Sequence, residues 1–307
     1  MSDPAEIGQD EAAPEVMKSP WDRFVAEYAR STLAMLGLVG VIVIVFAAIF
    51  APWITPQNPY DLEQLDLMDI RVPPGTVAGD GLSTYWVGTD DQGRDMYSAI
   101  VYGLRVSLGV GAGSALIAGI LGASLGLVAA YFGGRLDGAI MRLVDLQLSF
   151  PSILVALMIL AVLGKGIGNV VLALVLVEWA YYARTVRATA MVERRREYIE
   201  AAQGLVLPTR YILFTHLLPN CMAPLLVVGT QQVARAIALE ATLSFLGLGV
   251  PITEPSLGLL IANGYQYLLS GKYWISFYPG IALILTIVAL NLVGDQLRDM
   301  FNPRLRR

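Results

Sequence analysis

One stretch of the chain, LAMLGLVGVIVIVFAAIFA from Leu33 to Ala51, contains nineteen residues with neither a charge nor a polar side chain. At 1.5 Å rise per residue, a helix of this length extends about 28 Å, close to the roughly 30 Å hydrocarbon thickness of a bilayer. Hydrophobic residues make up 56% of the chain, charged residues only 15%, and the mean hydropathy is +0.60. A soluble domain carries about 25% charged residues. The sequence therefore predicts an integral membrane protein.

Five further apolar runs follow this one and predict an all-α protein with six transmembrane helices. The expected spans are residues 33–51, 104–130, 146–163, 167–182, 221–243 and 277–293. We expect the third helix to begin earlier, near Asp137, with its first two turns outside the hydrocarbon. The fourth span is short and includes the charged residue Glu178.

The basic residues predict which side of the membrane each segment faces. With the N-terminus inside, fifteen of the 21 Lys and Arg residues lie on cytoplasmic segments and five on outer segments, while Arg235 lies within a span. The cytoplasmic fifteen are Lys18, Arg23, Arg30, Arg135, Arg142, Arg184, Arg187, Arg194, Arg195, Arg196, Arg210, Arg298, Arg304, Arg306 and Arg307. This excess matches the bias of cytoplasmic loops toward Lys and Arg. Residues 1–20 are acidic and lack the basic start of a cleaved signal peptide, so both termini are expected in the cytoplasm.

The longest outer segment, residues 54–98, is rich in turn-forming residues, as in PWITPQNPYD and VPPGTVAGDG. We expect contacts with the rest of the protein to order it, because it lacks a core of its own. Its GRD sequence at 93–95 is expected to stabilise the segment, with a contact to a receptor protein as the alternative.

Small residues recur at helical spacing along the second span, at Gly109, Gly113, Ala118, Gly122 and Gly126. Four-residue spacing places small side chains on one face of a helix and lets another helix approach closely. We interpret this stripe as a helix-packing surface.

No catalytic or metal-binding constellation is found in the sequence. GKGIG from Gly164 lacks the upstream glycine and the Ser/Thr of a phosphate-binding loop. His216 has no metal ligand at suitable spacing, and the lone Cys221 excludes an internal disulfide. Energy for any active transport must therefore come from another subunit or from an ion gradient.

A charged segment, MVERRREYIEAAQGLVLPTRYILFTHLLPN at 191–220, interrupts the apolar sequence between the fourth and fifth spans. EYIEAAQGL contains good helix formers, and Pro208 is expected to end or bend that helix. TRYILFTHLL predicts a second short helix that leads to Pro219. The dense apolar residues Tyr198, Ile199, Ala201, Ala202, Leu205 and Val206 among charges indicate a protein–protein contact.

The EAA sequence at 200–202, the helix–turn–helix after it and the LP pair nineteen residues beyond Glu200 resemble the EAA loop of bacterial ABC-importer permeases. Other segments are similar to C-type permease subunits of dipeptide, oligopeptide and nickel importers, and they occur in the same order. They are VGTDDQGRDMYSAIVYGLRVSLGVG (87–111), GGRLDGAIMRLVDLQLSFPSILVAL (133–157), WAYYARTVR (179–187), LEATLSFLGLGV (239–250) and NLVGDQLRDMFNPRLR (291–306).

The resemblance implies a type I ABC-importer permease (MetI-like) fold in the bacterial inner membrane. It divides the chain into a cytoplasmic tail (1–30), a first transmembrane helix (31–54), a periplasmic loop (55–98), a permease core (99–298) that includes the coupling loop 191–220, and a C-terminal tail (299–307). The implied partners are a second homologous permease, two ATPase subunits that hold ATP and Mg²⁺, a periplasmic binding protein and membrane lipid. This chain is expected to bind no cofactor or nucleic acid and to catalyse no reaction.

The same resemblance implies which residues couple the permease to the ATPase: Tyr198, Ile199, Glu200, Ala201, Ala202, Gly204, Val206 and Pro219. One position departs from the family pattern, because Val206 stands where the loop usually has a glycine. Valine resists the positive φ that glycine supplies. We therefore expect a differently built turn that avoids positive φ at Val206, with Pro208 contributing to it.

Glu178, Arg235 and Glu240 are the ionisable residues deepest in the predicted spans. A charge at the bilayer centre costs about 2.5–3.5 kcal/mol, so each should face protein or a water-filled cavity. Glu178 either lines the translocation path and attracts a cationic part of the substrate, or pairs with an arginine or lies near an interface. Arg235 and Glu240 are five residues apart and are expected to find separate partners.

Nearer the cytoplasm, Arg142 and Asp145 are spaced for an i,i+3 pair.

For the whole protein, the alternative function is an ion-gradient-driven secondary transporter or channel. Paired mid-span carboxylates and internal repeats would favour that class, and neither is clear in this sequence.

Overall fold

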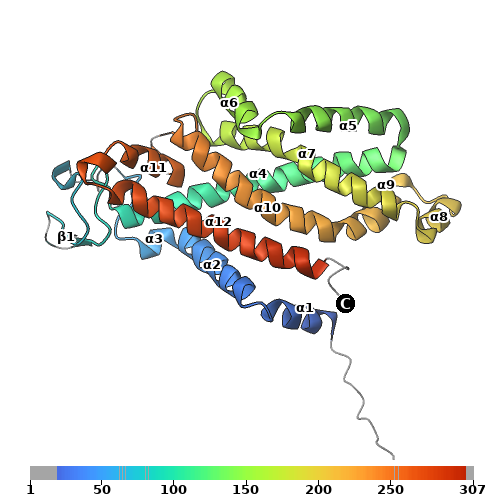
Figure 1. Cartoon of the computed structure of the whole chain (residues 1–307), viewed down its shortest axis with the longest axis horizontal. Coiled ribbons are helices and arrows are strands. Elements are labelled where there is room, and N and C mark those ends of the chain that lie inside the picture. The colour runs from blue at the N-terminus through green and yellow to red at the C-terminus, as the bar shows by residue number, and fades with distance from the viewer. Residues whose placement is uncertain are drawn as a thin grey trace, which may run out of the picture.

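The computed structural model describes residues 19–301 except 62, 64, 66, 80, 82, 252 and 255. The predicted tail residues 1–18 and 302–307, with Lys18, Arg304, Arg306 and Arg307, therefore lie outside the described residues. The described chain is an elongated bundle of long helices, as the composition predicts (Figure 1). A small hairpin lies at one end of the bundle and helix α8 (Glu197–Gly204) at the other (Figure 1), and we call these the hairpin end and the α8 end.

Five helical segments are long and apolar enough to span a membrane. They are α2 (Thr32–Ile49), α4 (Met96–Phe132), α7 (Ile167–Glu193), the continuous stretch Thr209–Phe245 that contains α10 (Leu218–Phe245), and α12 (Trp274–Phe301). These segments match the predicted first, second, fourth, fifth and sixth spans. The fourth is longer than predicted, because α7 continues eleven residues beyond Tyr182.

The third predicted span is a bent pair of helices, α5 (Gly134–Ser149) and α6 (Ser152–Leu163), which meet at 92°. The expectation of one helix starting near Asp137 is therefore wrong. Phe150 is extended, and Pro151 precedes the first residue of α6. A proline disfavours the helical conformation of the residue before it, which explains the break at this position. The twelve residues of α6 extend only about 18 Å.

Helix α4 packs closely against α7, and its small residues are the reason. A Cβ at Gly122 would lie 2.7 Å from Cβ of Tyr182, and one at Gly126 would lie 2.6 Å from the carbonyl oxygen of Ala183. The predicted packing stripe is thus confirmed for Gly122 and Gly126. It is wrong for Gly109 and Gly113, where an added Cβ would meet nothing within 4 Å.

Gly111, which the spacing argument omitted, provides the close contact of α4 with Ile237 of α10. The four-residue pattern therefore identified the α7-facing side of α4 and missed the side that faces α10. Three further helical elements complete the bundle: α1 (Pro20–Ala29), α3 (Ala51–Ile54) and α11 (Leu257–Tyr265). Short 3-10 turns lie at Leu67–Asp69 and Leu268–Ser270.

The hairpin end is built from strands β1 (Thr76–Val77) and β2 (Thr84–Tyr85) and from a buried polar cluster. Arg94 Nε donates to Asp90 Oδ2 at 2.6 Å, and both side chains are nearly inaccessible. Trp274 of α12 donates from Nε1 to the carbonyl oxygen of Thr89 at 3.1 Å. These contacts hold the described residues around the hairpin against the bundle, and Arg94 of the GRD sequence takes part in them.

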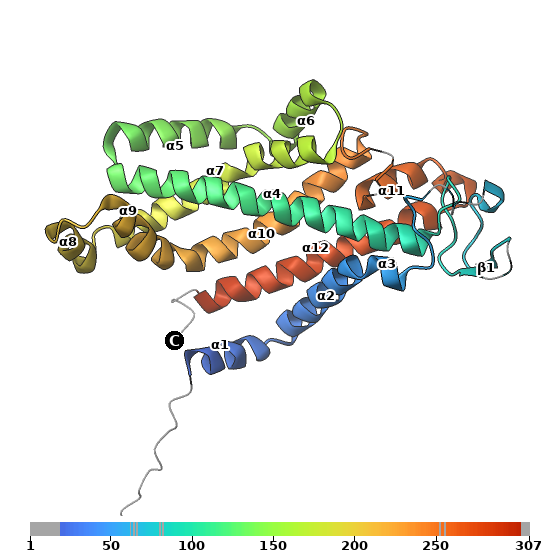
Figure 2. The ribbon, with the colours of Figure 1, turned by 180° about the vertical axis from the view of Figure 1, so that it is seen from behind.

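The described chain begins and ends near one another at the same side of the bundle. Helix α1 lies beside the C-terminal end of α12 in both ribbon views (Figures 1 and 2). Tyr28, Ala34 and Met300 form a buried cluster there, and the rings of Phe24 and Phe301 lie 6.3 Å apart.

Candidate functional site

Helix α8 (Glu197–Gly204) projects at the end of the bundle and is anchored through one face only (Figure 2). Ile199 is completely buried and Ala202 is 4% exposed, in a cluster with Ile212, Leu217 and residues of α4 and α7. Their spacing of three residues places both on one helical face. The expectation that all the apolar residues of the coupling loop form a contact surface is therefore wrong for Ile199 and Ala202.

The opposite face of α8 and its C-terminal turn are open to solvent. Glu200, Ala201 and Gly204 are exposed, and beyond them Leu205 and Val206 are 74% and 87% exposed. Two large apolar side chains this accessible at the tip of a projecting helix form a surface suited to another protein. We call Ala201, Leu205 and Val206 the tip surface.

Tyr198 connects α8 to the two helices on either side of it in the chain. Its hydroxyl donates to Glu193 Oε2 of α7 at 2.8 Å and accepts from Asn220 Nδ2 of α10 at 3.1 Å. Burial, together with the neighbouring Glu193 carboxylate, raises the pKa of Tyr198 to about 12. The phenol therefore stays protonated at neutral pH and keeps donating to Glu193. The His216 carbonyl accepts from Asn220 at 2.7 Å.

Val206 ends α8 in the left-handed conformation, with φ of 55°. The expectation that the turn would avoid positive φ at this residue is therefore wrong. The Val206 amide donates to the carbonyl of Gln203 at 2.9 Å, and the Leu207 amide donates to that of Ala202 at 3.2 Å. These two bonds form a Schellman C-cap. Leu207 also packs against the cluster that contains Ala202, so backbone bonds and burial together offset the strain on valine.

The strain at Val206 predicts that Val206→Gly will stabilise α8. Left-handed geometry costs an L-residue roughly 1–2 kcal/mol, and glycine loses about 0.5–1 kcal/mol of this advantage through chain entropy. We expect the free energy of opening α8 to rise by up to about 1 kcal/mol, which slows amide exchange across α8 roughly fivefold. Hydrogen exchange followed by mass spectrometry measures it.

Val192→Gly is the matched control, because Val192 is 60% exposed within α7, which has ordinary helical geometry. Glycine there should speed up local exchange, since glycine has a lower helix propensity than valine and Val192 lies in the last turn of α7. Equal loss of protection in both variants would contradict the strain at Val206.

The second helix of the coupling loop does not stand alone. Short α9 (Thr209–Tyr211) continues through the π-helical segment η3 (Ile212–Leu217) directly into α10, past Pro219. The prediction of a separate short helix ending at the membrane is therefore corrected. Pro219 cannot donate a backbone hydrogen bond, and it directly follows the π-helical segment, where the regular helical bonding pattern is already altered. One continuous helical segment thus joins the turn after α8 to the end of α10.

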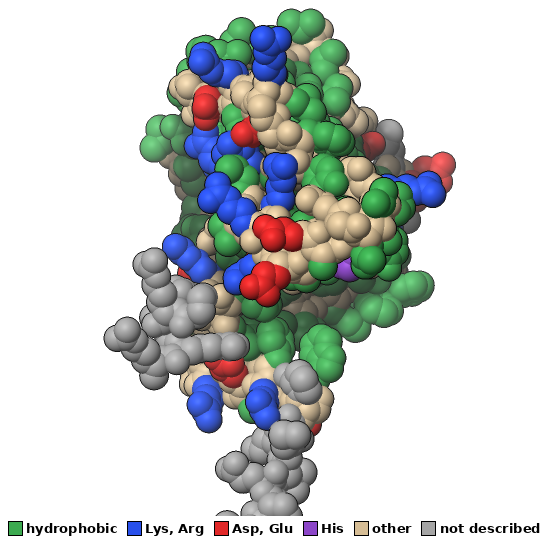
Figure 3. All heavy atoms as spheres, turned by 90° about the vertical axis from the view of Figure 1, so that its right-hand side faces the viewer, with side chains coloured by type: hydrophobic (Ala, Val, Ile, Leu, Met, Phe, Trp, Pro, Cys, Tyr) green, Lys and Arg blue, Asp and Glu red, His purple; other side chains and the backbone are tan. Residues whose placement is uncertain are grey.

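The face of the α8 end carries many basic side chains (Figure 3). Exposed arginines there are Arg135, Arg142, Arg184, Arg194, Arg195, Arg196 and Arg210. Two ion pairs join α5 to α7: Asp145 with Arg184, and Asp137 with Arg187. The expected Arg142–Asp145 pair is therefore wrong, because Asp145 has a partner on another helix. Neither ion pair was predicted, since the partners are 39 and 50 residues apart.

The two deepest carboxylates have different surroundings. Glu240 is fully buried and accepts from Ser107 Oγ of α4 at 2.9 Å and from Ser244 Oγ at 2.7 Å. Glu178 is also fully buried, but neither carboxylate oxygen has a hydrogen-bond partner among the described residues. Gln232 Nε2 of α10 is likewise buried and unpartnered within the described part of the chain.

Arg235 is held by neutral groups. Its Nη2 donates to Ser152 Oγ of α6 at 2.7 Å, and its guanidinium carbon lies 4.4 Å from the ring centroid of Tyr181. No carboxylate within residues 19–301 as described lies within 4.0 Å of its nitrogens. The prediction of separate partners for Arg235 and Glu240 is confirmed.

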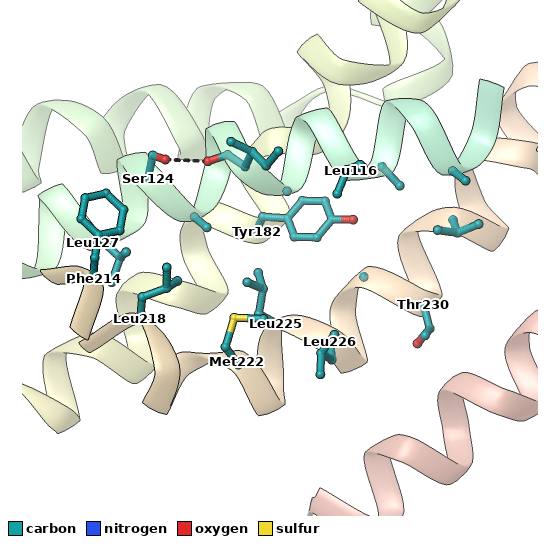
Figure 4. A pocket seen from close by; sticks show the side chains of 17 residues that line it. Leu116, Ser124, Leu127, Tyr182, Phe214, Leu218, Met222, Leu225, Leu226 and Thr230 are labelled. Carbon is teal, nitrogen blue, oxygen red and sulfur yellow. Dashed lines mark hydrogen bonds between the residues drawn. The ribbon is translucent and has the colours of Figure 1, made fainter. Parts of the chain in front are cut away.

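A groove of about 680 Å³ runs between α4 and α10 (Figure 4). Its walls are almost entirely aliphatic, and the Tyr182 hydroxyl from α7 points into it (Figure 4). Ser124 and Thr230 also line it, but their hydroxyls donate to Ile120 and Val227 carbonyls of their own helices. The groove therefore suits acyl chains or another helix and offers no charge to a polar solute.

A bundle of membrane helices interrupted by a projecting helix on a charged face is the architecture of a transport permease. Residues 122–307 match the family described as "Binding-protein-dependent transport system inner membrane component", and residues 19–74 match the "N-terminal TM domain of oligopeptide transport permease C". The chain belongs to the family of inner-membrane components of binding-protein-dependent transport systems. It is a transmembrane permease subunit of such a transport system.

Curated relatives match over nearly the whole chain. The di/tripeptide transport system permease protein DppC of Pseudomonas aeruginosa (strain UCBPP-PA14) is 38% identical over 291 residues, covering 95% of this chain and 94% of that protein. The dipeptide transport system permease protein DppC of Escherichia coli (strain K12) is 40% identical, with 95% and 96% covered. The oligopeptide transport system permease protein OppC of Bacillus subtilis (strain 168) is 34% identical, with 99% and 96% covered.

Among solved structures, the inward-facing MetNI methionine ABC transporter contains a chain with the same fold. The TM-score is 0.54 at 19% identity, and the match covers 67% of this chain and 98% of that chain. The predicted MetI-like permease fold is thereby confirmed.

Proposed function

We propose that this chain forms half of the translocation path for peptides or similar small solutes and receives the work of ATP hydrolysis through α8. The observation that carries the proposal is the anchoring of α8 by Ile199 and Ala202, which presents the tip surface beyond the bundle. The relatives named for di/tripeptide, dipeptide and oligopeptide transport support the choice of substrate class.

The proposed partners follow from this role. Two cytoplasmic ATPase subunits hold ATP and Mg²⁺, and each permease places its tip surface against one of them. A second homologous permease completes the path, and a periplasmic binding protein delivers the solute at the hairpin end. The helix bundle is then a two-state element, biased by nucleotide at one end and by the loaded receptor at the other.

We further propose that the α8 end faces the cytoplasm, with both termini inside. The exposed arginines of this end support the orientation, because cytoplasmic segments carry an excess of basic residues. The hairpin end, with its buried Asp90–Arg94 pair, then faces the periplasm.

The test is purification of the complex and reconstitution into vesicles. We expect an ATPase to co-purify with this chain and peptide uptake to require ATP and to be blocked by vanadate. Uptake by this chain alone, driven by an ion gradient and insensitive to vanadate, would replace the proposal with a secondary transporter.

Within the path, we propose that Glu178 attracts the cationic end of the solute. Its carboxylate is fully buried here and has no hydrogen-bond partner among the described residues, so a solute reaches it only when the helices around it rearrange. An unpaired intramembrane carboxylate is costly unless it has a functional partner.

Glu178→Gln should lower uptake of a dipeptide with a free amino terminus about tenfold relative to its N-acetylated form. Uptake by reconstituted complexes measures the ratio. Glu240→Gln is the control, because two serine hydroxyls already occupy that carboxylate, and it should affect both substrates equally. Unchanged uptake of both peptides by the Glu178 variant would remove this role.

A further inference from the structure

A second, smaller cavity lies where the start of α6 approaches α10. Its volume is about 320 Å³, within the range of small-ligand sites. It is lined by Pro151, Ser152, Ile153, Arg235, Ala238, Leu239 and Thr242. Its polar groups are the Arg235 guanidinium and the Ser152 and Thr242 hydroxyls, so its chemistry differs from that of the aliphatic groove between α4 and α10.

Arg235 lies near the middle of the span that the sequence predicts on α10. It is three residues from the centre of the predicted span 221–243, or about 4.5 Å along the helix axis. A cation at this depth normally pairs with an anion or faces water. Here the guanidinium is half-buried and makes no ion pair with a carboxylate of the described residues.

The contacts of Arg235 hold the guanidinium in place and leave donors available. The Tyr181 ring lies against it, and Ser152 accepts from one nitrogen. Stacking against an aromatic ring leaves the edge of the guanidinium open, and that edge matches the two oxygens of a carboxylate. A neutral serine oxygen satisfies one donor and leaves the positive charge uncompensated.

We propose that Arg235, together with Ser152, binds the carboxylate of the transported solute. This inference rests on the proposed function and deepens it: for a peptide, the ligand is the C-terminal carboxylate, which every linear peptide carries whatever its side chains. Arg235 would therefore bind a group that all peptide substrates share. Lipid phosphates share this anionic chemistry but lie at the membrane surface, about half a bilayer away from a mid-span residue.

The test measures uptake by the full complex in vesicles, using a dipeptide and its C-terminal amide chosen so that the receptor binds both. Arg235→Gln should lower uptake of the free acid at least tenfold and uptake of the amide less than twofold. Arg235→Lys keeps the positive charge but loses the planar guanidinium. Its ratio of acid uptake to amide uptake should therefore lie between those of the wild type and Arg235→Gln. Arg142→Gln, which removes an exposed arginine of α5, should leave both rates unchanged.

Equal loss of acid and amide uptake in Arg235→Gln would overturn the proposal, since it indicates a structural partner, a lipid phosphate or a carboxylate of the second permease. If Arg235→Gln fails to assemble, an unchanged acid-to-amide ratio in Arg235→Lys overturns it as well. Wild-type complexes that show no vanadate-sensitive uptake would instead reject the proposed function.

Discussion

Replacing Ala202 with aspartate is expected to reduce receptor-stimulated ATP hydrolysis to the basal rate. Ala202 is 4% exposed and packs in the cluster that anchors α8. A carboxylate forced into this site without a partner costs several kcal/mol. Only Ile199 and Ala202 are buried within the eight residues of α8, so the helix should detach from the bundle. ATP hydrolysis by reconstituted complexes, with and without loaded receptor, measures the effect.

Ala201→Asp separates anchoring from contact, because Ala201 is exposed on the same helix. Ala201→Asp should lower receptor-stimulated ATP hydrolysis while α8 keeps its protection from hydrogen exchange. Ala202→Asp should lose both the stimulation and the protection. Glu200→Ala, on the exposed face, should behave like Ala201→Asp. Full stimulation in the Ala202 variant would show that α8 does not couple the permease to the ATPase.

Replacing Gly122 with leucine is expected to prevent the bundle from assembling. A Cβ there would overlap the Trp179 carbonyl oxygen and would lie 2.7 Å from Tyr182 Cβ and 3.0 Å from Ala183 N. Two of these atoms belong to the backbone of α7 and cannot rotate away. Overpacking costs typically 1–3 kcal/mol and more when backbones must separate. We expect at least a tenfold loss of monodisperse protein, or a fall in melting temperature of about 10 °C.

Gly109→Leu is the matched control on the same helix, because an added Cβ at Gly109 meets nothing within 4 Å. Size-exclusion profiles of the two variants provide the comparison. Equal recovery would mean that α4 and α7 do not need a glycine at their contact.

The six apolar segments could be predicted because hydropathy is a property of neighbouring residues. The bend in the third could not be predicted from hydropathy alone, since residues 146–163 are apolar on both sides of Pro151. The proline was the available signal. It indicates a break, but the 92° angle depends on how α5 and α6 pack against the other helices.

The coupling segment was recognisable from its EAA sequence, yet the roles of its residues were not. The spacing of Ile199 and Ala202 indicates a shared face without showing whether that face meets the bundle or a partner. At Val206 the intrinsic preference of valine predicts a negative φ, yet the structure has a φ of 55° there. Two backbone bonds and the burial of Leu207 outweigh that propensity, and both depend on the position of α8 against the bundle.

The charged residues within the spans show which properties the sequence determines and which the tertiary structure determines. The sequence alone determined that Glu178, Arg235 and Glu240 must avoid lipid, because the cost of a bare charge depends only on depth in the membrane. Tertiary structure decided their partners: Ser107 lies 133 residues from Glu240, and Ser152 lies 83 residues from Arg235. It also left Glu178 without a hydrogen-bond partner among the described residues. Helical spacing along α10 could indicate Ser244 as a partner of Glu240, whereas Ser107 and Ser152 become partners because different helices meet.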